Sequence, residues 1–246
     1  MDKSEIIEIY DLPTVDNVCN QILREVISLP KVSMAHVIMN PKNVSLWHRH
    51  SRMSEVYFIL SGEGVLYYGD RALKVKKGAH LVLPPKTPHK LKNTGKKDLV
   101  HLVFAVPPFD SEDVELLKES SQTNKSQIKT FKQDQAPIMA QDGAEIYELI
   151  SNKERKALDV ALAVGLLPPN RKAVSHLHKV SEEVYYIISG KGKIKVGNID
   201  YKVRADSVVH VPINAVHALE NESGSEDLEV LCLSSPAYSD EDFILK

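Results

Sequence analysis

The sequence predicts an all-β protein that consists of two similar domains in tandem. An internal repeat spans most of the chain, and short apolar runs alternate with polar residues between turn signals. The 246 residues are enough for two domains of ordinary size, and the 43% of hydrophobic residues are enough for a core. A net charge of -2 provides no bulk attraction to nucleic acid or to a membrane surface, so we expect neither as a partner.

The repeat aligns residues 48–93 with residues 176–221 at a constant offset of 128, without a gap, and 16 of the 46 positions are identical. Beyond it, Glu8-Ile9-Tyr10 resembles Glu145-Ile146-Tyr147. Residues 118–135 are rich in Lys, Gln, Ser, Thr and Asn, as in a linker. We therefore predict an N-terminal domain over 1–110, a helical turn and polar linker over 111–135, and a C-terminal domain over 136–246.

Within each domain, the apolar pattern predicts mostly short strands, which favours a sandwich or a barrel. The expected strands cover residues 55–60, 65–68, 79–83 and 99–106 in the first half, and 184–188, 207–211 and 228–233 in the second. Short helices are the exceptions. Apolar residues at helical spacing after Thr14 predict a helix over 14–26, and residues 111–117 predict one or two turns.

Each copy of the repeat contains a His-x-His pair, a glutamate and a later histidine at the same spacings. Residues two apart in a strand share a face, so each pair directs two imidazoles the same way. Glu55 lies five residues after His50 and shares that face only if residues 51–54 form a turn or bulge. His89 follows a proline-rich turn that can return the chain to the same cavity. The candidate metal ligands are His48, His50, Glu55, His89, His176, His178, Glu183 and His217.

Three imidazoles and one carboxylate suit a divalent transition metal with open positions for water or substrate. We expect up to two such ions per chain, with Fe, Mn, Ni, Zn, Co and Cu all compatible with the ligand set.

These motifs resemble the two conserved motifs of the cupin superfamily, and the duplication resembles a bicupin. The first motif, G(X)5HXH(X)3,4E(X)6G, is matched from the histidine pair to Gly62 and Gly190, without its leading glycine in either copy. The second, G(X)5PXG(X)2H(X)3N, is matched from Gly78 to Asn93 and from Pro212 to Asn221. Its inner glycine is replaced by Lys86 and Asn214, and its outer glycine by Asp206 in the second copy.

The resemblance implies two jelly-roll barrels with a metal inside each. The superfamily includes dioxygenases, isomerases, epimerases, decarboxylases, cyclases, sensors and storage proteins, so fold alone does not choose the reaction. We expect a metal-dependent enzyme of the oxygenase type that acts on a small polar metabolite. A metal-dependent sugar isomerase, epimerase or cyclase and a non-catalytic small-molecule-binding bicupin are the alternatives.

The candidate catalytic residues are Tyr57, Tyr185, Glu55 and Glu183. Each tyrosine follows its glutamate by two residues and is expected on the same face, although packing in the barrel wall explains it equally well. The two cysteines, Cys19 and Cys232, are interpreted as apolar filling. His101 aligns with Glu229 and is expected as an ordinary strand histidine.

The expected partner is a small-molecule substrate or ligand, and the resemblance adds the expectation of a homodimer. No apolar run approaches the length of a membrane span, and the first residues lack a basic region followed by an apolar stretch. We therefore expect a cytoplasmic protein.

Overall fold

The computed structural model describes residues 5–17, 19, 21–118, 124–127, 136–150 and 152–246. The chain divides into two compact units. One comprises residues 12–134 and is called the first barrel; the other comprises residues 1–11 and 135–246 and is called the second barrel. Most of the expected linker, 119–123 and 128–135, lies outside the described residues.

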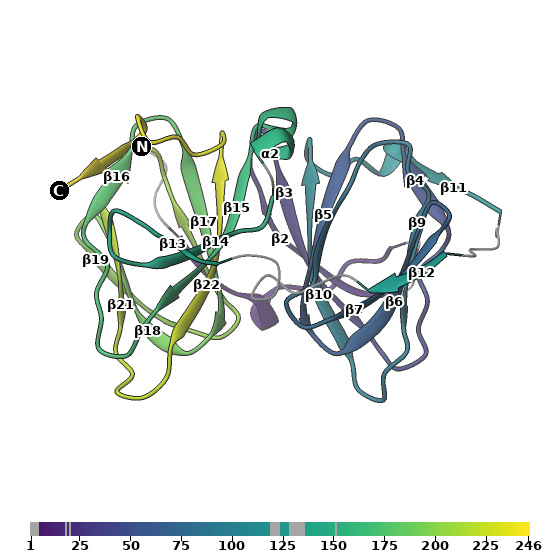
Figure 1. Ribbon diagram of the computed structural model, residues 1–246, viewed down its shortest axis with the longest axis horizontal. Helices are drawn as coiled ribbons and strands as arrows, with labels where there is room; N and C mark the ends of the chain where they lie inside the picture. The colour runs from purple at the N-terminus through teal and green to yellow at the C-terminus, as the bar shows by residue number, and fades with distance from the viewer. Residues whose placement is uncertain (1–4, 18, 20, 119–123, 128–135, 151) are drawn as a thin grey trace. The chain divides into compact units, whose positions relative to one another are not determined.

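The first barrel is a pair of antiparallel sheets with one added parallel strand (Figure 1). Its five-stranded sheet has the order β2 (Ile22–Ser28), β3 (Ser33–Met39), β10 (Leu99–Val106), β5 (Ser54–Ser61), β8 (His80–Leu83). Its six-stranded sheet has the order β11 (Val114–Leu116), β4 (His48–His50), β9 (His89–Asn93), β6 (Glu63–Tyr68), β7 (Arg71–Lys76), β12 (Asn124–Gln127). A 3-10 turn, η2 (Ser111–Asp113), precedes β11.

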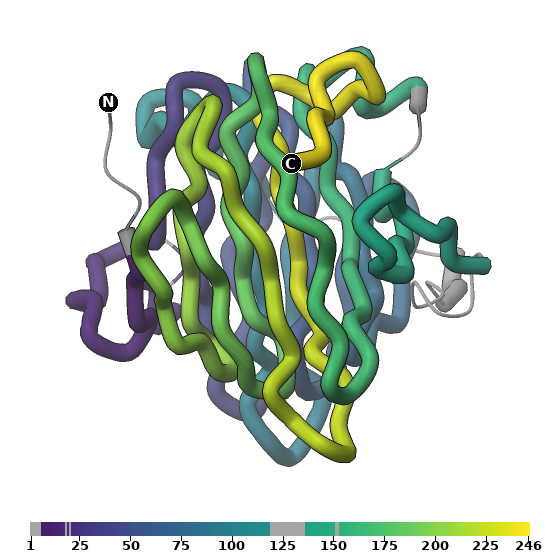
Figure 2. Tube along the Cα trace, turned by 90° about the vertical axis from the view of Figure 1, so that its left-hand side faces the viewer, coloured from purple at the N-terminus to yellow at the C-terminus, as the bar shows by residue number. Residues whose placement is uncertain are grey.

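The second barrel repeats this arrangement, and Figure 2 shows its strands side by side in green and yellow. Its seven-stranded sheet has the order β1 (Glu5–Glu8), β20 (Ser207–Val211), β17 (Glu182–Ser189), β22 (Leu228–Ser235), β15 (Ala161–Leu167), β14 (Glu145–Glu148), β13 (Ile138–Met139). Its five-stranded sheet has the order β19 (Ile199–Arg204), β18 (Lys191–Val196), β21 (His217–Asn221), β16 (His176–His178), β23 (Phe243–Leu245). Helix α2 (Asn152–Leu158) joins β14 to β15, and η1 (Ile9–Asp11) follows β1. The all-β prediction of two jelly-roll barrels is confirmed.

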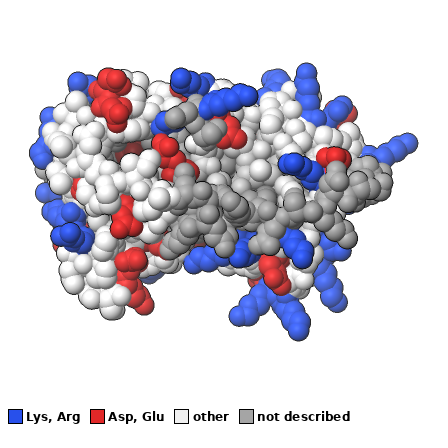
Figure 3. Space-filling view, viewed as in Figure 1, with Lys and Arg blue, Asp and Glu red and all other residues white. Residues whose placement is uncertain are grey.

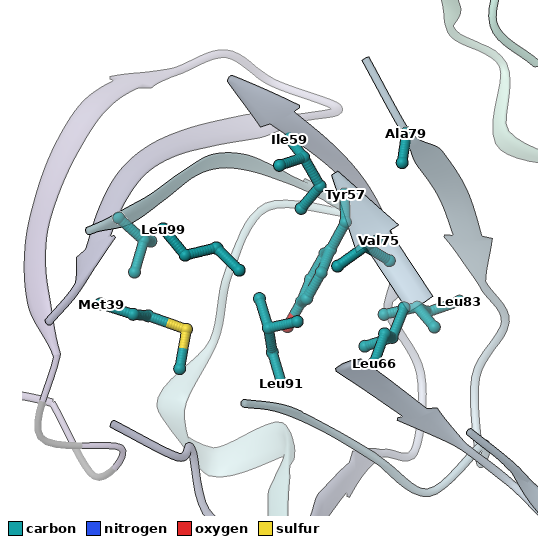
Figure 4. Packing of buried hydrophobic residues seen from close by; sticks show 10 residues of the cluster. Met39, Tyr57, Ile59, Leu66, Val75, Ala79, Leu83, Leu91 and Leu99 are labelled. Carbon is teal, nitrogen blue, oxygen red and sulfur yellow. The ribbon is translucent and has the colours of Figure 1, made fainter. Parts of the chain in front are cut away.

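Each barrel is filled by apolar side chains from the inward faces of its two sheets. Figure 4 shows this core in the first barrel, with the Tyr57 ring among aliphatic side chains. The first core contains Val37, Met39, Tyr57, Ile59, Leu66, Val75, Ala79, Leu83, Leu91 and Leu99. The second contains Leu167, Ile187, Ile194, Val196, Val203, Val209, Val211, Leu228 and Val230.

The residues that replace motif glycines keep the backbone conformation of the motif. Gly78 has φ +81°, and Asp206 at the same place in the second barrel has φ +70°. Lys86 and Asn214 also match, with φ +65° and +63°. Left-handed backbone is what a glycine supplies at low cost, so both halves retain the turn despite the substitutions.

The prediction of a helix over 14–26 is wrong, because residues 22–28 form strand β2. The Asn17 side chain accepts hydrogen bonds from the backbone N–H groups of Cys19 and Gln21 and donates to the Gln21 carbonyl. This turn folds Val15 back against Leu23, whose carbonyl accepts from the Val15 N–H at 2.9 Å. A local Asn turn therefore competes successfully with the helical spacing of the apolar residues.

The boundaries of the barrels also differ from the expected 1–110, 111–135 and 136–246. Strand β1 pairs with β20, so residues 5–8 belong to the second barrel. Strands β11 and β12 pair with β4 and β7, so part of the expected linker belongs to the first barrel. Residues 8–10 and 145–147 have similar sequences but do not occupy equivalent places. Strand β14 pairs with β15 as β2 pairs with β3, so the equivalent of β14 in the first barrel is β2.

The face in Figure 3 carries basic and acidic side chains that are interspersed. Among the described residues, no helix combines the length and the apolar composition that crossing a bilayer requires.

Candidate metal centres

In the first barrel, three chain segments converge on one point. Strand β4 buries His48 and His50 on the same face, and the chain turns at residues 51–53 before β5 begins at Ser54. The Lys86 N–H then donates to the His50 carbonyl at 2.6 Å, and β9 pairs with β4 so that His89 lies opposite His48. The turn required by the spacing from His50 to Glu55 is present, and it returns the glutamate to the face of the histidines.

A buried aspartate holds this turn in each barrel. Asp113 accepts hydrogen bonds from the backbone N–H groups of Ser51, Arg52 and Met53 at 3.0–3.1 Å. Asp242 accepts from the N–H groups of Val180 and Ser181 and from the Ser181 hydroxyl. Neither aspartate is among the residues predicted from the sequence, although each ends one of two similar acidic segments, 109–113 and 238–242, which could have indicated them.

The eight candidate ligands form two groups of four, and the ligand atoms of each group lie within 4.8 Å of one another. In the first group, the Nε2 atoms of His50 and His89 lie 3.4 and 2.9 Å from Oε2 of Glu55. In the second, the Nε2 atoms of His178 and His217 lie 3.3 and 3.0 Å from Oε2 of Glu183.

Backbone carbonyls orient two histidines in each group. Nδ1 of His48 and His89 lies 2.8 and 2.9 Å from the carbonyl oxygen two residues earlier, and Nδ1 of His176 and His217 lies 3.0 Å from the equivalent oxygens. A hydrogen bond there requires the proton on Nδ1, which leaves the lone pair of a neutral imidazole on Nε2. Each ring thus presents its free nitrogen to the centre of the group.

The two groups are close copies in geometry. In the first, the ring centroids of His48 and His89 are 4.3 Å apart, and His50 lies 5.1 Å from His48 and 5.6 Å from His89. The corresponding separations in the second are 4.2, 5.4 and 5.8 Å. All eight side chains are buried.

The electrostatics keep the carboxylate ionised and divide the imidazoles of each group. Burial by itself would lower the pKa of His89 and His178, but the adjacent carboxylates of Glu55 and Glu183 outweigh it and raise both. Burial, together with the charge of His89, lowers the pKa of His48 to about 4. Burial by itself would raise the pKa of Glu55, but the His50 and His89 imidazoles, whose Nε2 atoms lie 3.4 and 2.9 Å from Oε2, outweigh it and hold this pKa far below its ordinary value. The pKa of Glu183 is lowered in the same way by His178 and His217.

These groups suit a divalent cation. The ionised carboxylate supplies a negative charge that compensates a buried cation, and a metal binds in place of the imidazole protons. Among the described residues, Nε2 of His50 and His89 and Oε2 of Glu55 are buried without hydrogen-bond partners, although they face one another. Buried polar atoms without partners are typical of a site for an ion, and this donor set suits a transition metal.

The two tyrosines lie beside the glutamates as predicted, and each packs against the core of its barrel. The Tyr57 ring belongs to the first core and packs against His101, with centroids 5.3 Å apart. The Tyr185 hydroxyl lies 3.2 Å from both Oε2 of Glu183 and Nε2 of His217. Burial, with the charge of Glu183, raises the pKa of Tyr185 well above its ordinary value, so this hydroxyl keeps its proton at neutral pH.

The interpretation of the cysteines as apolar filling is wrong for Cys232. Its Sγ donates to Oε1 of Glu183 at 3.3 Å, and the Ser234 hydroxyl donates to the same oxygen at 3.4 Å. Cys19 hydrogen-bonds to the Leu46 carbonyl, which also accepts from His48, so it too adjoins a metal centre. Burial raises the pKa of both thiols.

The structural counterpart of His101 in the second barrel is Val230, one residue after the Glu229 with which the sequence repeat aligns it. His101 lies opposite Ile59, and Val230 lies opposite Ile187, the counterpart of Ile59 in the second barrel. The loop between β21 and β22 has one residue more than the loop between β9 and β10, which shifts the register after the repeat. A buried imidazole in the first barrel therefore replaces a valine of the second.

The rim arginines are held by carboxylates of the barrel itself. Arg49 makes two hydrogen bonds to Glu115, at 2.8 and 2.9 Å, and Arg52 pairs with Asp110 and Asp113. They therefore support β11 and η2.

The second centre opens into a cavity of about 840 Å³ within its own barrel. The lining includes His176, His178 and Glu183 of the metal group, together with Tyr185 and Cys232. The Phe243 ring, which also lines the cavity, stacks on His176 with centroids 4.4 Å apart. A volume of this size is within the range of pockets that bind drug-sized ligands.

The comparisons with known proteins agree with this geometry. The profile of the Cupin domain family matches residues 35–105 and again residues 163–234. An uncharacterised protein of Methanocaldococcus jannaschii is 35% identical over 115 residues, which are 47% of this chain and 91% of that protein. An uncharacterised protein of Streptomyces coelicolor is 34% identical over 115 residues, 46% of this chain and 100% of that protein. Both relatives thus correspond in length to one barrel.

Solved structures with two such barrels share the fold of nearly the whole chain. The oxalate decarboxylase of Lactobacillus farciminis, in its formate complex, superposes with a TM-score of 0.74 at 18% identity, over 98% of this chain and 88% of that one. An oxalate decarboxylase of Bacillus subtilis gives a TM-score of 0.70 at 17% identity, over 95% and 78%. At this level of identity the likeness concerns the fold alone.

Proposed function

We propose that this chain, which belongs to the cupin family, is a metal-dependent enzyme of the oxygenase type whose substrate binds in the second barrel. The observation that carries the proposal is that His176, His178 and Glu183 of the second centre line a cavity large enough for a substrate. The oxalate decarboxylases with this fold are named for a dicarboxylate, which supports a substrate with metal-chelating oxygen atoms.

The side chains of the second centre have separate roles in this proposal. His176, His178, His217 and Glu183 would hold the metal, with His176 and His217 oriented by the carbonyls that accept from Nδ1. A bound redox-active ion would supply Lewis acidity and electron transfer to O2. The Tyr185 hydroxyl holds a proton beside Glu183 and can donate it to a substrate oxygen.

The first centre has the same four ligands and the same candidate pair of Glu55 and Tyr57. Because the buried His101 ring lies against Tyr57 where the second barrel has Val230, we assign this centre a metal that stabilises the barrel rather than turnover.

The test is turnover by protein loaded anaerobically with Fe(II), Mn(II) or Zn(II). Oxygen uptake and product formation are followed with a panel of chelating carboxylates, enols and diols. We expect His178→Ala to lower turnover at least about 100-fold, whereas His50→Ala keeps most of it. Equal turnover in His178→Ala and wild type would contradict the proposal.

Two other outcomes select the alternatives. Turnover with zinc and without oxygen consumption would indicate an isomerase, epimerase or cyclase, in which the Tyr185 hydroxyl moves a proton. Ligand binding without turnover across the panel would indicate a binding protein.

A further inference from the structure

The cavity of the second barrel has a wall whose chemistry differs from that of its metal end. The metal end carries His176, His178, Glu183, Tyr185 and Ser234. The inward face of β14, β15 and β22 beyond the metal end is aliphatic, with Ile146, Ala163, Leu167 and Val230 in the lining. An aliphatic wall contributes to binding only when a ligand displaces water from it.

The sequence of β15 helps to create this space. Gly165 lines the cavity and corresponds to Val37 of the first core. Leu167 pairs with Leu228 as Met39 pairs with Leu99, so these two pairs are equivalent. Gly165 and Val37 each lie two residues before the first member of their pair. A Cβ built on Gly165 would meet Ile146 Cδ1 at 3.4 Å and the Val230 carbonyl at 3.9 Å, which are ordinary contacts. The backbone at Gly165 therefore does not demand a glycine, and its absent side chain leaves space in the cavity.

The connection between β14 and β15 also contributes to the lining of the cavity. In the first barrel, β2 runs seven residues and returns directly into β3. In the second, β14 has four residues and is followed by helix α2, from which Arg155 and Lys156 line the cavity. Arg155 is paired with Glu148 at 3.2 Å, so its charge is already balanced within the wall.

We propose that the second centre takes a ligand with a metal-chelating head and an uncharged apolar body, on the order of 10 to 20 non-hydrogen atoms in all. This inference rests on the proposed function and specifies its substrate class. A bare dicarboxylate would occupy only the metal end and leave the aliphatic wall in water. The apolar body would instead lie along the Gly165 side of the cavity.

The test is a series of ligands that share one chelating head. Acetohydroxamate, benzohydroxamate and 2-naphthohydroxamate, each with its matching primary amide, are titrated by calorimetry into the full chain after its metal content is measured. We expect the affinity to rise about 10- to 100-fold from the smallest to the largest hydroxamate, since the apolar area buried grows along the series. The amides are expected to bind more weakly and to show the same trend.

Cavity-filling variants locate the apolar body. Gly165→Val gives the second barrel the side chain of the first and should lower the affinity for 2-naphthohydroxamate about tenfold while leaving acetohydroxamate unchanged. Ala163→Phe, on the same face of β15, should have a larger effect. The matched control is Val37→Ile in the first barrel, which should leave the whole series unchanged.

The outcomes separate this inference from the proposed function. Affinity that is flat or falls with size, or a trend that neither cavity variant alters, overturns the inference even if the enzyme turns over. A chain that cannot be loaded with metal refutes the proposed function, and hydroxamates then lose their advantage over amides. In that case the amide series decides: a rise that Gly165→Val removes supports the apolar site, and a flat series overturns it.

Discussion

The two barrels hold nearly the same metal group in different surroundings. The ring separations in the two groups agree within 0.3 Å, and a buried aspartate holds the turn before the glutamate in both. Behind this group, the first barrel has Val37 and His101 where the second has Gly165 and Val230. The comparison shows that the ligand framework can be copied faithfully while side chains one or two strands from the strand of the glutamate differ.

Glycines at the matching hairpins test whether the framework is equivalent. Gly62 and Gly190 have φ +81° and +89°, and a Cβ on either would lie 2.5 or 2.6 Å from a backbone carbonyl oxygen. We expect Gly62→Ala and Gly190→Ala each to lower the free energy of unfolding by about 3 kcal/mol or more, because both backbone strain and overlap arise. Urea denaturation measures the cost.

The control for these variants is the second pair of hairpin glycines. Gly69 and Gly197 have φ +55° and +60°, with no atom within 4 Å of a built Cβ. Gly69→Ala and Gly197→Ala should cost about 1 kcal/mol, from the left-handed backbone alone. A large cost in one barrel and a small cost in the other would break the equivalence of the two frameworks.

Substitution of Asp113 and Asp242 should affect the stability of both barrels but the metal affinity of the second centre more than that of the first. Asp113→Asn and Asp242→Asn each weaken hydrogen bonds to backbone N–H groups, and we expect each to lower the free energy of unfolding by about 2 kcal/mol. Only Asp242 also lies 3.4 Å from Nδ1 of a metal-group histidine, His178. Metal titration should show affinity reduced about tenfold at the second centre of Asp242→Asn, with Asp113→Asn changing the first centre less. The reverse order would contradict the assigned role of Asp242.

His101 should give the first barrel a pH dependence that the second lacks at this position. Burial, with the charge of His36, lowers the pKa of His101 to about 3, against about 6.5 in an unfolded chain. Between these values the unfolded chain binds a proton that the folded barrel does not, so stability falls as the pH falls from 6.5 towards 3. At pH 5 this loss is about 2 kcal/mol relative to pH 8.

The variant His101→Val introduces the side chain that Val230 supplies in the second barrel, and it removes the loss of stability that the titration of His101 causes. Unfolding free energies at pH 8 and pH 5 should differ less in His101→Val than in wild type, by about 2 kcal/mol. Because packing changes affect both pH values alike, the difference between them isolates the titration. An unchanged pH dependence would show that His101 is protonated in the folded protein.

The sequence predicted the metal groups well because their geometry is local. The His-x-His spacing fixes a strand face, the distance from His50 to Glu55 requires a turn, and Pro84 to Pro88 returns the chain to β4. The surroundings of Tyr57 and Tyr185 depend on residues farther along the chain. Their place beside the glutamates followed from strand alternation, but the core packing of Tyr57 depended on His101 from β10.

Features that depend on distant pairing or on single side chains could not be predicted. The Asn17 turn replaced a helix by a hairpin, and β1 left its own half to pair with β20. One additional residue in the loop after β21 shifted the register that aligned His101 with Glu229. The contact between Cys232 and Glu183 follows only from the pairing of β22 with β17, to which the spacing of two cysteines gives no clue.

The metal content of the chain, purified without a histidine tag, tests the central claim most directly. Elemental analysis would compare wild type, His50→Ala and His178→Ala after equilibration with excess divalent ion. We predict about two ions per chain in wild type and one in each variant, since each substitution removes a ligand from one of the two groups. Wild-type protein that holds none, and that added ions cannot load, would contradict the account.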